Sequence, residues 1–380
     1  MKALYLIKIP AASTAGGKAK YEVVLREKIT LPQLGSNDVM VKISACALTR
    51  VDTKTILQVT QRKDEPIPIG FSISGSVTKV GSDVKLISLG DEVAGVLPMD
   101  TTCSGCADHC VIPEYCLVKK PKTVSHIDCA AVMEPGIIGL TAILHQARLT
   151  PGSTVLIFSG CSATGVILMQ LFASYGAKVI AVVDNSDGAK LLSSLEPRPS
   201  RIIDMSSQEK SLVDICLQET GGLGVDCVVD DGVAPGYSLD SFVIEPRSFR
   251  TELEEAQNRH DYENEVTLPR VLPTKQQILN CMSVHGHWVT TQPDLQLDPP
   301  ESQTLYLKSI SLHFLFSATW LLSGRFQGKY LDMLMNTISK LEDGIVKPYV
   351  HHTVSLQDSV QEMKQLGGHY LGSVVMTNSL

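Results

Sequence analysis

One segment near the middle of the chain, TVLIFSGCSATGVILMQLFASYGAKVIAVVD at 154–184, restricts the fold more than any other. An apolar strand runs into a turn of small residues, an apolar helix follows, and a second apolar strand ends at Asp184. Two strands joined through a helix pair in parallel with a right-handed crossover. The segment therefore predicts the beginning of a parallel sheet covered by helices.

The alternation of strands and helices continues on both sides of this segment. A helical pattern precedes it at 128–147, and strands and helices alternate after it up to a strand at 225–233. Residues 244–270 are charged and poor in aliphatic side chains, which indicates an exposed insertion. A strand is expected again at 284–291, and TLYLKSISLHFLF at 304–316 predicts a further pair of strands.

The first 120 residues or so have a different pattern. VMVKISACAL at 39–48 and ISGSVTKVG at 73–81 are continuously apolar or alternate apolar with polar residues, as strands do. Gly and Asp residues separate such segments. HCVIPEYCLVKKP at 109–121 predicts another strand pair. The pattern is typical of an antiparallel, barrel-like domain, and the tail ends in a strand at 372–377.

Composition excludes several classes of protein. The 380 residues suggest about two domains. The formal net charge of -7 argues against direct nucleic-acid binding, which needs basic surfaces. No run of 18 or more apolar residues occurs, so no membrane insertion is expected.

The N-terminus and the cysteines indicate a compartment. Lys8 and Pro10 interrupt the first apolar stretch too early for a signal-peptide core. We therefore expect a soluble protein of the cytosol. Its ten cysteines would be thiols or metal ligands rather than disulfides.

The turn SGCSATG at 159–165 has the size that a dinucleotide site requires. Backbone N–H groups of such a turn approach a pyrophosphate, and the helix N-terminus adds donors and partial positive charge. An acidic residue about 20 positions on accepts hydrogen bonds from the adenosine ribose. The predicted cofactor-binding residues of this unit are Ser159, Gly160, Ser162, Ala163, Thr164, Gly165 and Asp184.

The turn departs from the G-x-x-G-x-x-G pattern. Ser159 and Ser162 stand where glycine is expected, and only Gly165 is kept. Serine is small and donates to phosphate, but it tolerates left-handed backbone angles poorly. The alternative is a βαβ unit with an ordinary turn and no bound nucleotide. For Asp184 the alternative is the N-cap of the helix in DGAKLL.

Four cysteines, Cys103, Cys106, Cys110 and Cys116, fall close together. Four thiolates are a ligand set of structural zinc. Cys110 and Cys116 lie in a strand pattern, where a rise of roughly 3.3 Å per residue would hold them about 20 Å apart. We expect buried free thiols, and metal binding stays open only for Cys103 and Cys106.

Several blocks together resemble a known family. The order of PIGFSISGSVTKVG, GDEVAG, CVIPEYCLVKKP, PGSTVLIFSGCSATG and GAKVIAVV is similar to the medium-chain dehydrogenase/reductase superfamily, in its quinone oxidoreductase (zeta-crystallin-like) branch. The resemblance covers nearly the whole chain. It implies an α/β fold: a GroES-like, partly open β-barrel catalytic domain from 1–130 and 305–380, and a Rossmann doubly wound parallel sheet from 131–304.

The resemblance also implies cofactors and site residues. Members bind NADPH or NADH and transfer a hydride to a quinone or an enone; NADPH is the usual cofactor, whereas the Asp184 carboxylate favours NADH. Family analogy puts the nicotinamide near Thr49 and Thr141, and puts Asp231 and Gly232 beside the cofactor at the sheet edge. The alternatives stay open that Thr141 caps or packs and that Thr49 simply fills a lost ligand site.

Zinc-dependent relatives use an early Cys and a Gly-His-Glu motif as catalytic ligands. Here Thr49 takes the place of the cysteine, and Phe71 and Ser72 replace His-Glu. Phenylalanine has no lone pair for a metal, so no catalytic zinc is expected. His285 and His287 are open to two interpretations, a general acid or ordinary strand-end residues.

Two functions follow as expectations. The first is a zinc-independent, NAD(P)H-dependent quinone oxidoreductase-like enzyme. The second is a non-catalytic scaffold: a vertebrate member of this branch is counted among the subunits of the FERRY complex, a Rab effector on early endosomes that helps carry mRNA. Endosomal complex subunits would then be its partners and would make any RNA contact. The family forms homodimers through the edge of the Rossmann sheet, for which SISLHFLF at 309–316 is the candidate.

Overall fold

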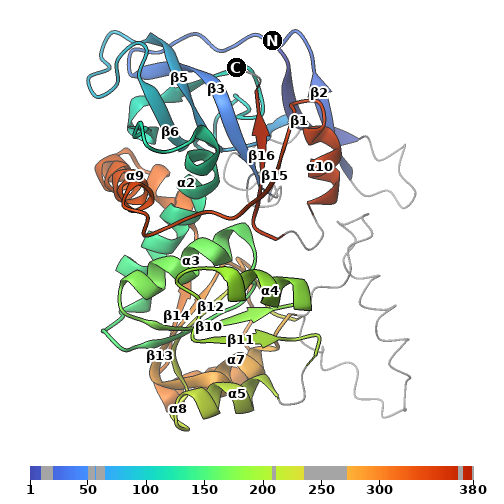
Figure 1. Cartoon of the computed structure of the whole chain (residues 1–380), viewed down its shortest axis with the longest axis vertical. Coiled ribbons are helices and arrows are strands. Elements are labelled where there is room, and N and C mark those ends of the chain that lie inside the picture. The colour runs from blue at the N-terminus through green and yellow to red at the C-terminus, as the bar shows by residue number, and fades with distance from the viewer. Residues whose placement is uncertain are drawn as a thin grey trace.

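The computed structural model of the chain describes residues 1–9, 20–49, 56, 65–207, 211–234, 272–366 and 371–378 (Figure 1). These residues form one unit around a largely antiparallel sheet and another around a parallel sheet. The charged segment at 244–270 lies outside the described residues. The division of the chain at 130 stays a prediction, and the one at 305 is too early, because the strand Ser311–Phe314 belongs to the parallel sheet.

A six-stranded parallel sheet forms the core of the second unit. Its strands lie in the order β11, β10, β9, β12, β13, β14, and each neighbouring pair is parallel. Figure 1 shows α3 and α4 on one face and α5, α7 and α8 on the other, which confirms the predicted doubly wound sheet. The strands are β9 (Thr154–Ile157), β10 (Lys178–Val183), β11 (Arg201–Asp204), β12 (Val225–Asp230), β13 (Met282–Thr290) and β14 (Ser311–Phe314), and the helices are α3 (Ala163–Ser174), α4 (Ser186–Ser194), α5 (Leu212–Glu219), α7 (Lys275–Cys281) and α8 (Pro299–Lys308).

The segment at 304–316 is the end of a helix followed by one strand, so the predicted pair of strands is wrong. Its apolar residues favour a strand, but the start of α8 lies upstream in the sequence DPPE. Pro299 occupies the first helical position, where its missing N–H is not needed. The Glu301 carboxylate accepts the backbone N–H of Asp298 at 2.6 Å, which closes the first turn.

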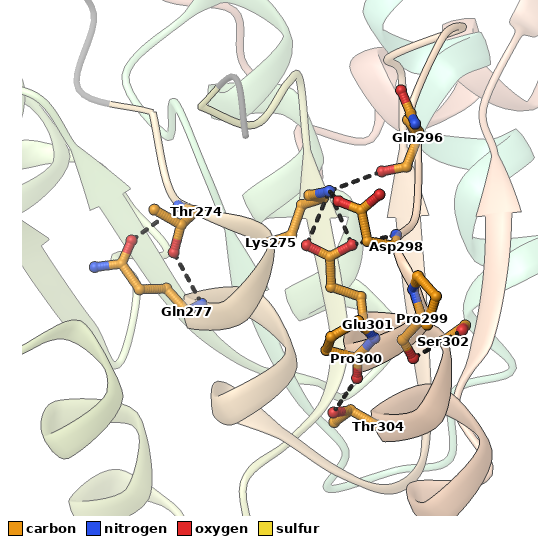
Figure 2. Close-up of polar contacts among 10 residues, drawn as sticks. All are labelled: Thr274, Lys275, Gln277, Gln296, Asp298, Pro299, Pro300, Glu301, Ser302 and Thr304. Atoms are coloured by element: carbon orange, nitrogen blue, oxygen red, sulfur yellow. Dashed lines mark hydrogen bonds and ion pairs between the residues drawn. The ribbon is translucent and has the colours of Figure 1, made fainter. Parts of the chain in front are cut away.

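A buried lysine reinforces this helix start (Figure 2). The Lys275 ammonium on α7 lies 2.8 Å from Glu301 Oε1, and it donates to the carbonyl oxygen of Gln296 at 2.9 Å. Lys275 is only 8% exposed. A lysine buried to this degree needs such partners. Tertiary contacts therefore stabilise the start of α8, a helix that the apolar pattern of 304–316 did not predict.

The first unit contains a seven-stranded sheet and a three-stranded sheet. The large sheet runs in the order β15, β16, β3, β5, β6, β8 with β7 paired to β3, and the small one in the order β2, β1, β4. Strand β16 pairs antiparallel with β3, so both ends of the chain build this barrel-like unit, as expected. The strands are β1 (Ala3–Ile9), β2 (Lys20–Arg26), β3 (Asp38–Leu48), β4 (Ile67–Pro68), β5 (Ser72–Val80), β6 (Glu92–Val96), β7 (His109–Pro113), β8 (Leu117–Lys119), β15 (Val350–Val354) and β16 (Ser373–Thr377), and a short helix α10 (Ser359–Gln365) lies between the last two.

One apolar helix, α2 (His126–Thr141), lies between the two units. It packs against β3, β5 and β6 on one side, and against α3 and α9 (Gln327–Glu342) on the other. With its π-helical continuation to Ala147 it is long and apolar enough to cross a membrane, but 72% of its most apolar window is buried inside the protein. Its apolar surface is therefore used in core packing.

A buried glutamine fastens α3 to the segment that follows α9. Gln170 Oε1 accepts the backbone N–H of Lys347 at 2.7 Å, and Gln170 Nε2 donates to the carbonyl oxygen of the same residue at 2.9 Å. Gln170 itself is buried. Because a buried polar group without a partner is costly, this pair of bonds holds the parallel unit to the chain that returns to the barrel.

Replacing Gln170 with alanine should lower the free energy of unfolding by about 2 kcal/mol, because the Lys347 backbone groups lose their partner. The matched control is Gln276→Ala on α7, whose exposed side chain bonds Asn280 at 2.9 Å. That control should change stability by less than about 0.5 kcal/mol. Denaturant unfolding measures both variants, and equal effects would contradict the role of Gln170.

Candidate functional site

The carboxyl ends of β9 and β12 meet where the order of the strands changes direction. Strands β10 and β11 extend the sheet to one side of β9, and β12, β13 and β14 extend it to the other. Open parallel sheets bind ligands in the crevice at such a point. The turn at 159–165 directly follows β9, and Asp231 directly follows β12, so both border this crevice.

The turn at 159–165 places the start of α3 at the crevice. Ser162 is the N-cap of this helix, and its hydroxyl accepts the backbone N–H of Gly165 at 3.0 Å. The amides of the first helical turn, among them those of Ala163 and Thr164, have no acceptor within the helix. Together with the helix dipole they form an arrangement that suits an anion such as a pyrophosphate.

Two glycines make this turn compact. A β-carbon on Gly165 would lie 2.3 Å from the carbonyl oxygen of Ser159, so only glycine fits between the turn and the helix. A β-carbon on Gly160 would lie 3.0 Å from Cβ of Ala181 on β10. Close helix–strand packing at this glycine is what dinucleotide turns require, so the residues present fit such a cofactor.

Ser159 occupies the strained position of the turn. Its φ of 53° is left-handed, a region that glycine enters at little cost and serine does not. The Ser159 hydroxyl donates to Oδ1 of Asp231 at 3.1 Å. The bond joins the ends of β9 and β12 and offsets part of the backbone strain.

A buried carboxylate, Asp230, shapes the second border of the crevice. It accepts hydrogen bonds from Trp288 Nε1, from the Thr290 hydroxyl at 2.8 Å and from the backbone N–H of Gly232 at 2.8 Å. Burial raises the pKa of Asp230, while these three donors favour its ionised form. The predicted pair Asp231 and Gly232 is thus held by a neighbour that sequence reasoning did not single out.

Asp184 lies beside the turn, as the spacing predicts. It follows β10 directly, and the N–H of Gly160 donates to the carbonyl oxygen of Val182 on that strand at 2.8 Å. The interpretation of Asp184 as an N-cap is wrong, because Asn185 caps α4 by accepting the N–H of Gly188 at 2.9 Å. Capping of α4 therefore does not involve the Asp184 carboxylate.

The barrel reaches the turn through its last strand. Gly372 forms a parallel bridge with Ser162, and its N–H donates to the carbonyl oxygen of Cys161 at 2.8 Å. Two residues on, Val374 pairs with Leu48 at the end of β3. Thr49 follows Leu48, so the structure brings this predicted site residue to the edge of the crevice.

Thr141 lies deeper, at the end of α2. Its hydroxyl accepts the indole N–H of Trp320 at 3.0 Å and donates to the sulfur of Met333 at 3.7 Å. Thr141 is only 3% exposed. A hydroxyl has two lone pairs, so one acceptor position remains beside the Trp320 bond, and the predicted nicotinamide contact stays a prediction.

Comparisons with known proteins agree with this geometry. Residues 35–156 match the family model of the alcohol dehydrogenase GroES-like domain. The mouse quinone oxidoreductase-like protein 1 is 37% identical over 90% of this chain and 91% of its own length. The chain belongs to the quinone oxidoreductase branch of the medium-chain dehydrogenase/reductase superfamily.

Solved structures of this superfamily share the fold over the full chain. A quinone oxidoreductase of Escherichia coli complexed with NADPH superimposes with a TM-score of 0.71 at 17% identity and covers 100% of both chains. A quinone oxidoreductase of Pseudomonas syringae pv. tomato gives a TM-score of 0.71 at 19% identity, over 99% of this chain and 100% of its own. At these identities the likeness shows the fold alone.

Ser72, which the resemblance places at a zinc-ligand position of metal-dependent members, has a structural role here. Its hydroxyl donates to the carbonyl oxygen of Ala130 on α2 at 2.6 Å. The cysteines are free thiols, and all but Cys161 are buried. Among the described residues, no group of three or more His, Cys, Asp or Glu side chains has the arrangement of a metal site.

The predicted histidines lie on the sheet rather than at the turn. His287 on β13 faces His313 on β14, with Nδ1 and Nε2 3.2 Å apart, and burial lowers the pKa of both. His285 is exposed and has a left-handed φ of 62°. A general acid role for either stays a prediction.

We predict that Ser159→Gly is more stable than Ser159→Ala. Both lose the bond to Asp231, worth about 1 kcal/mol. Only glycine also relieves the left-handed strain, worth about 1 kcal/mol. The order would be unusual, since glycine ordinarily destabilises relative to alanine. Chemical unfolding midpoints decide it, and a more stable alanine variant would contradict the turn conformation.

Gly165→Ala should destabilise the protein by about 2 kcal/mol, because the new methyl group meets backbone atoms that cannot move aside. Dinucleotide binding should weaken with it. The control is Gly328→Ala on α9, where no atom lies within 4 Å of the added carbon. Thermal unfolding with and without cofactor compares the two, and equal stability of the variants would show that the turn is looser than described.

Proposed function

We propose that the chain binds NADPH or NADH in the crevice between β9 and β12 and reduces a quinone or an activated enone without a metal ion. The observation that carries this proposal is the turn at 159–165, where Gly165 leaves no room for a β-carbon and the start of α3 is directed at the crevice. Membership in the quinone oxidoreductase branch supports the substrate class.

Different residues of the crevice would contact different parts of the cofactor. The amides of Ala163 and Thr164 and the Ser162 cap would hold the pyrophosphate, and Asp184 would accept the ribose hydroxyls. Asp231 and Gly232 would border the nicotinamide half, with Thr49 and Thr141 orienting the carboxamide. The bound cofactor supplies a hydride, and the protein supplies its orientation and a protected surrounding.

The direct test is a titration of the purified protein with NADPH and with NADH, followed by nicotinamide fluorescence and by melting temperature. A ligand at 100 times its Kd stabilises the folded state by about 2.7 kcal/mol. A shift with either cofactor supports the site and justifies a screen of quinones. No shift with either at millimolar concentration would refute the proposal.

Asp184→Asn should move the cofactor preference toward NADPH by about tenfold, which corresponds to about 1.4 kcal/mol. The neutral amide no longer repels the 2′-phosphate. The control is Asp214→Asn, which changes an exposed carboxylate paired with Ser211 at the start of α5. The ratio of the two Kd values measures the effect, and an unchanged ratio would mean that Asp184 does not face the ribose.

A second proposal is a scaffold role in an endosomal complex of the FERRY type, at early endosomes and otherwise in the cytoplasm. It is supported by two departures from the expected cofactor site, a serine in place of glycine at 159 and a Thr141 hydroxyl that already accepts the indole N–H of Trp320. Capture of endosomal subunits from cells by a protein that binds no dinucleotide would support it. Capture of none of them would exclude it.

We also propose that two copies associate through β14, the edge strand of the parallel sheet. Phe314 at its end is half exposed, and within the described part of the chain no strand pairs with the outer edge of β14. Sedimentation equilibrium of the wild-type protein and of a Leu312→Pro variant tests this. A monomeric wild type would refute it.

A further inference from the structure

A carboxyl group that the proposed cofactor contacts do not use lies beside Thr49. Glu134, in the middle of α2, is partly exposed as a residue, yet its Oε2 atom is enclosed and has no hydrogen-bond partner in the described part of the chain. The Thr49 side chain is hydrogen bonded to this carboxyl group. No cation of the described residues contributes to its electrostatic surroundings. A lone carboxyl in an apolar helix therefore needs an explanation.

The backbone around Glu134 is held in place by an inserted side chain. Ser72 on β5 donates to the carbonyl oxygen of Ala130 at 2.6 Å and accepts the backbone N–H of Glu134 at 3.4 Å. These two backbone groups pair with each other in a regular helix. Pro135, the next residue, interrupts the ladder in the same turn. The hydroxyl of Ser72 thus fixes the turn of α2 that carries the carboxyl.

Thr49 connects this carboxyl to the crevice. Thr49 follows the end of β3, where Leu48 pairs with Val374 of β16. Gly372, two residues before Val374, forms a bridge with Ser162 of the turn at 159–165. The chain of contacts therefore runs from Glu134 through the Thr49 hydroxyl to the rim of the proposed cofactor site. The two residues lie 85 positions apart in the sequence, and only the packing of α2 on β3 brings them together.

We propose that Glu134 stores the proton of the reduction and that Thr49 passes it to the substrate. This inference rests on the proposed function. The quinone takes one proton and two electrons, together a hydride, from the nicotinamide and becomes a hydroquinone anion. The Thr49 hydroxyl proton moves to the anionic oxygen, and the Glu134 carboxyl proton moves to the Thr49 oxygen. Glu134 is left as a carboxylate and regains its proton from water.

The surroundings of Glu134 favour the neutral form of its carboxyl group. Burial raises its pKa, and the hydrogen bond from Thr49 acts in the opposite direction. Among the described residues, the titratable groups that feel its charge are Cys46 on β3 and Tyr330 on α9, and burial raises the pKa of both well above their usual values. Neither of them titrates near neutral pH, so a proton released there is attributable to Glu134.

The protonation state can be measured without cofactor. The infrared spectrum of the wild-type protein at neutral pH should contain the carbonyl band of a protonated carboxyl that Glu134→Gln lacks. The control Glu27→Gln, an exposed glutamate paired with Lys2 at 2.8 Å, should keep the band. A wild-type spectrum without such a band would overturn the inference.

Stability against pH gives a second readout. Because the pKa of Glu134 is raised by folding, its contribution to stability is complete below the usual glutamate value of about 4.3 and is lost as pH rises through the folded value. The melting temperature of Glu134→Gln relative to wild type should therefore climb over that range. A difference that does not vary with pH would overturn the inference.

Turnover completes the test once a quinone or enone substrate is in hand. Glu134→Gln should lower kcat by about a hundredfold, as expected for loss of a general acid, and should lose the alkaline limb of the wild-type pH profile. Glu134→Asp should recover part of both. Identical pH profiles for wild type and Glu134→Gln would refute proton storage while the proposed function stands. Absence of turnover in the wild type would refute the proposed function itself, and the infrared band would still report the state of Glu134.

Discussion

The burial of α2 between the two units is the constraint on which the rest of the structure depends. This helix packs on β3, β5 and β6 with one side and on α3 and α9 with the other, so it sets how the barrel meets the parallel sheet. Burial of so much apolar surface is the main favourable contribution to folding. The hydrogen bonds of buried Gln170 and the bridge from Gly372 to Ser162 lie at the same junction and help to fix the orientation of the two units.

The candidate site follows from this junction. The parallel sheet by itself supplies the turn at 159–165, Asp184 and the loop of Asp231 at one edge. The barrel adds Thr49 and, through α2, the carboxyl of Glu134. In the proposed function the cofactor contacts come mainly from the parallel unit and the proton supply comes from the barrel and α2.

Much of the candidate site was predictable because its parts are local in sequence. A strand, a small-residue turn and a helix follow one another within 159–165 and its flanks, and Asp184 lies at a fixed spacing. The helix that ends within 304–316 could not be predicted in the same way. Its N-terminal cap at Asp298 and Glu301 lies upstream of the segment, and the ion pair that supports this cap comes from Lys275 on another helix. The role of Asp230 could not be predicted from the sequence, because its hydrogen-bond partner Trp288 lies 58 residues away.

The sequence by itself determined the parallel α/β unit, the antiparallel first domain and the position of the cofactor turn, because periodicity and glycine placement are properties of neighbouring residues. Tertiary structure alone decided the role of Ser72 and the pairing of Thr49 with Glu134. Ser72 is a helix-docking residue only because β5 lies against α2. Glu134 is a candidate proton store only because packing encloses one oxygen of its carboxyl group, and burial is a property of the whole fold rather than of any stretch of sequence.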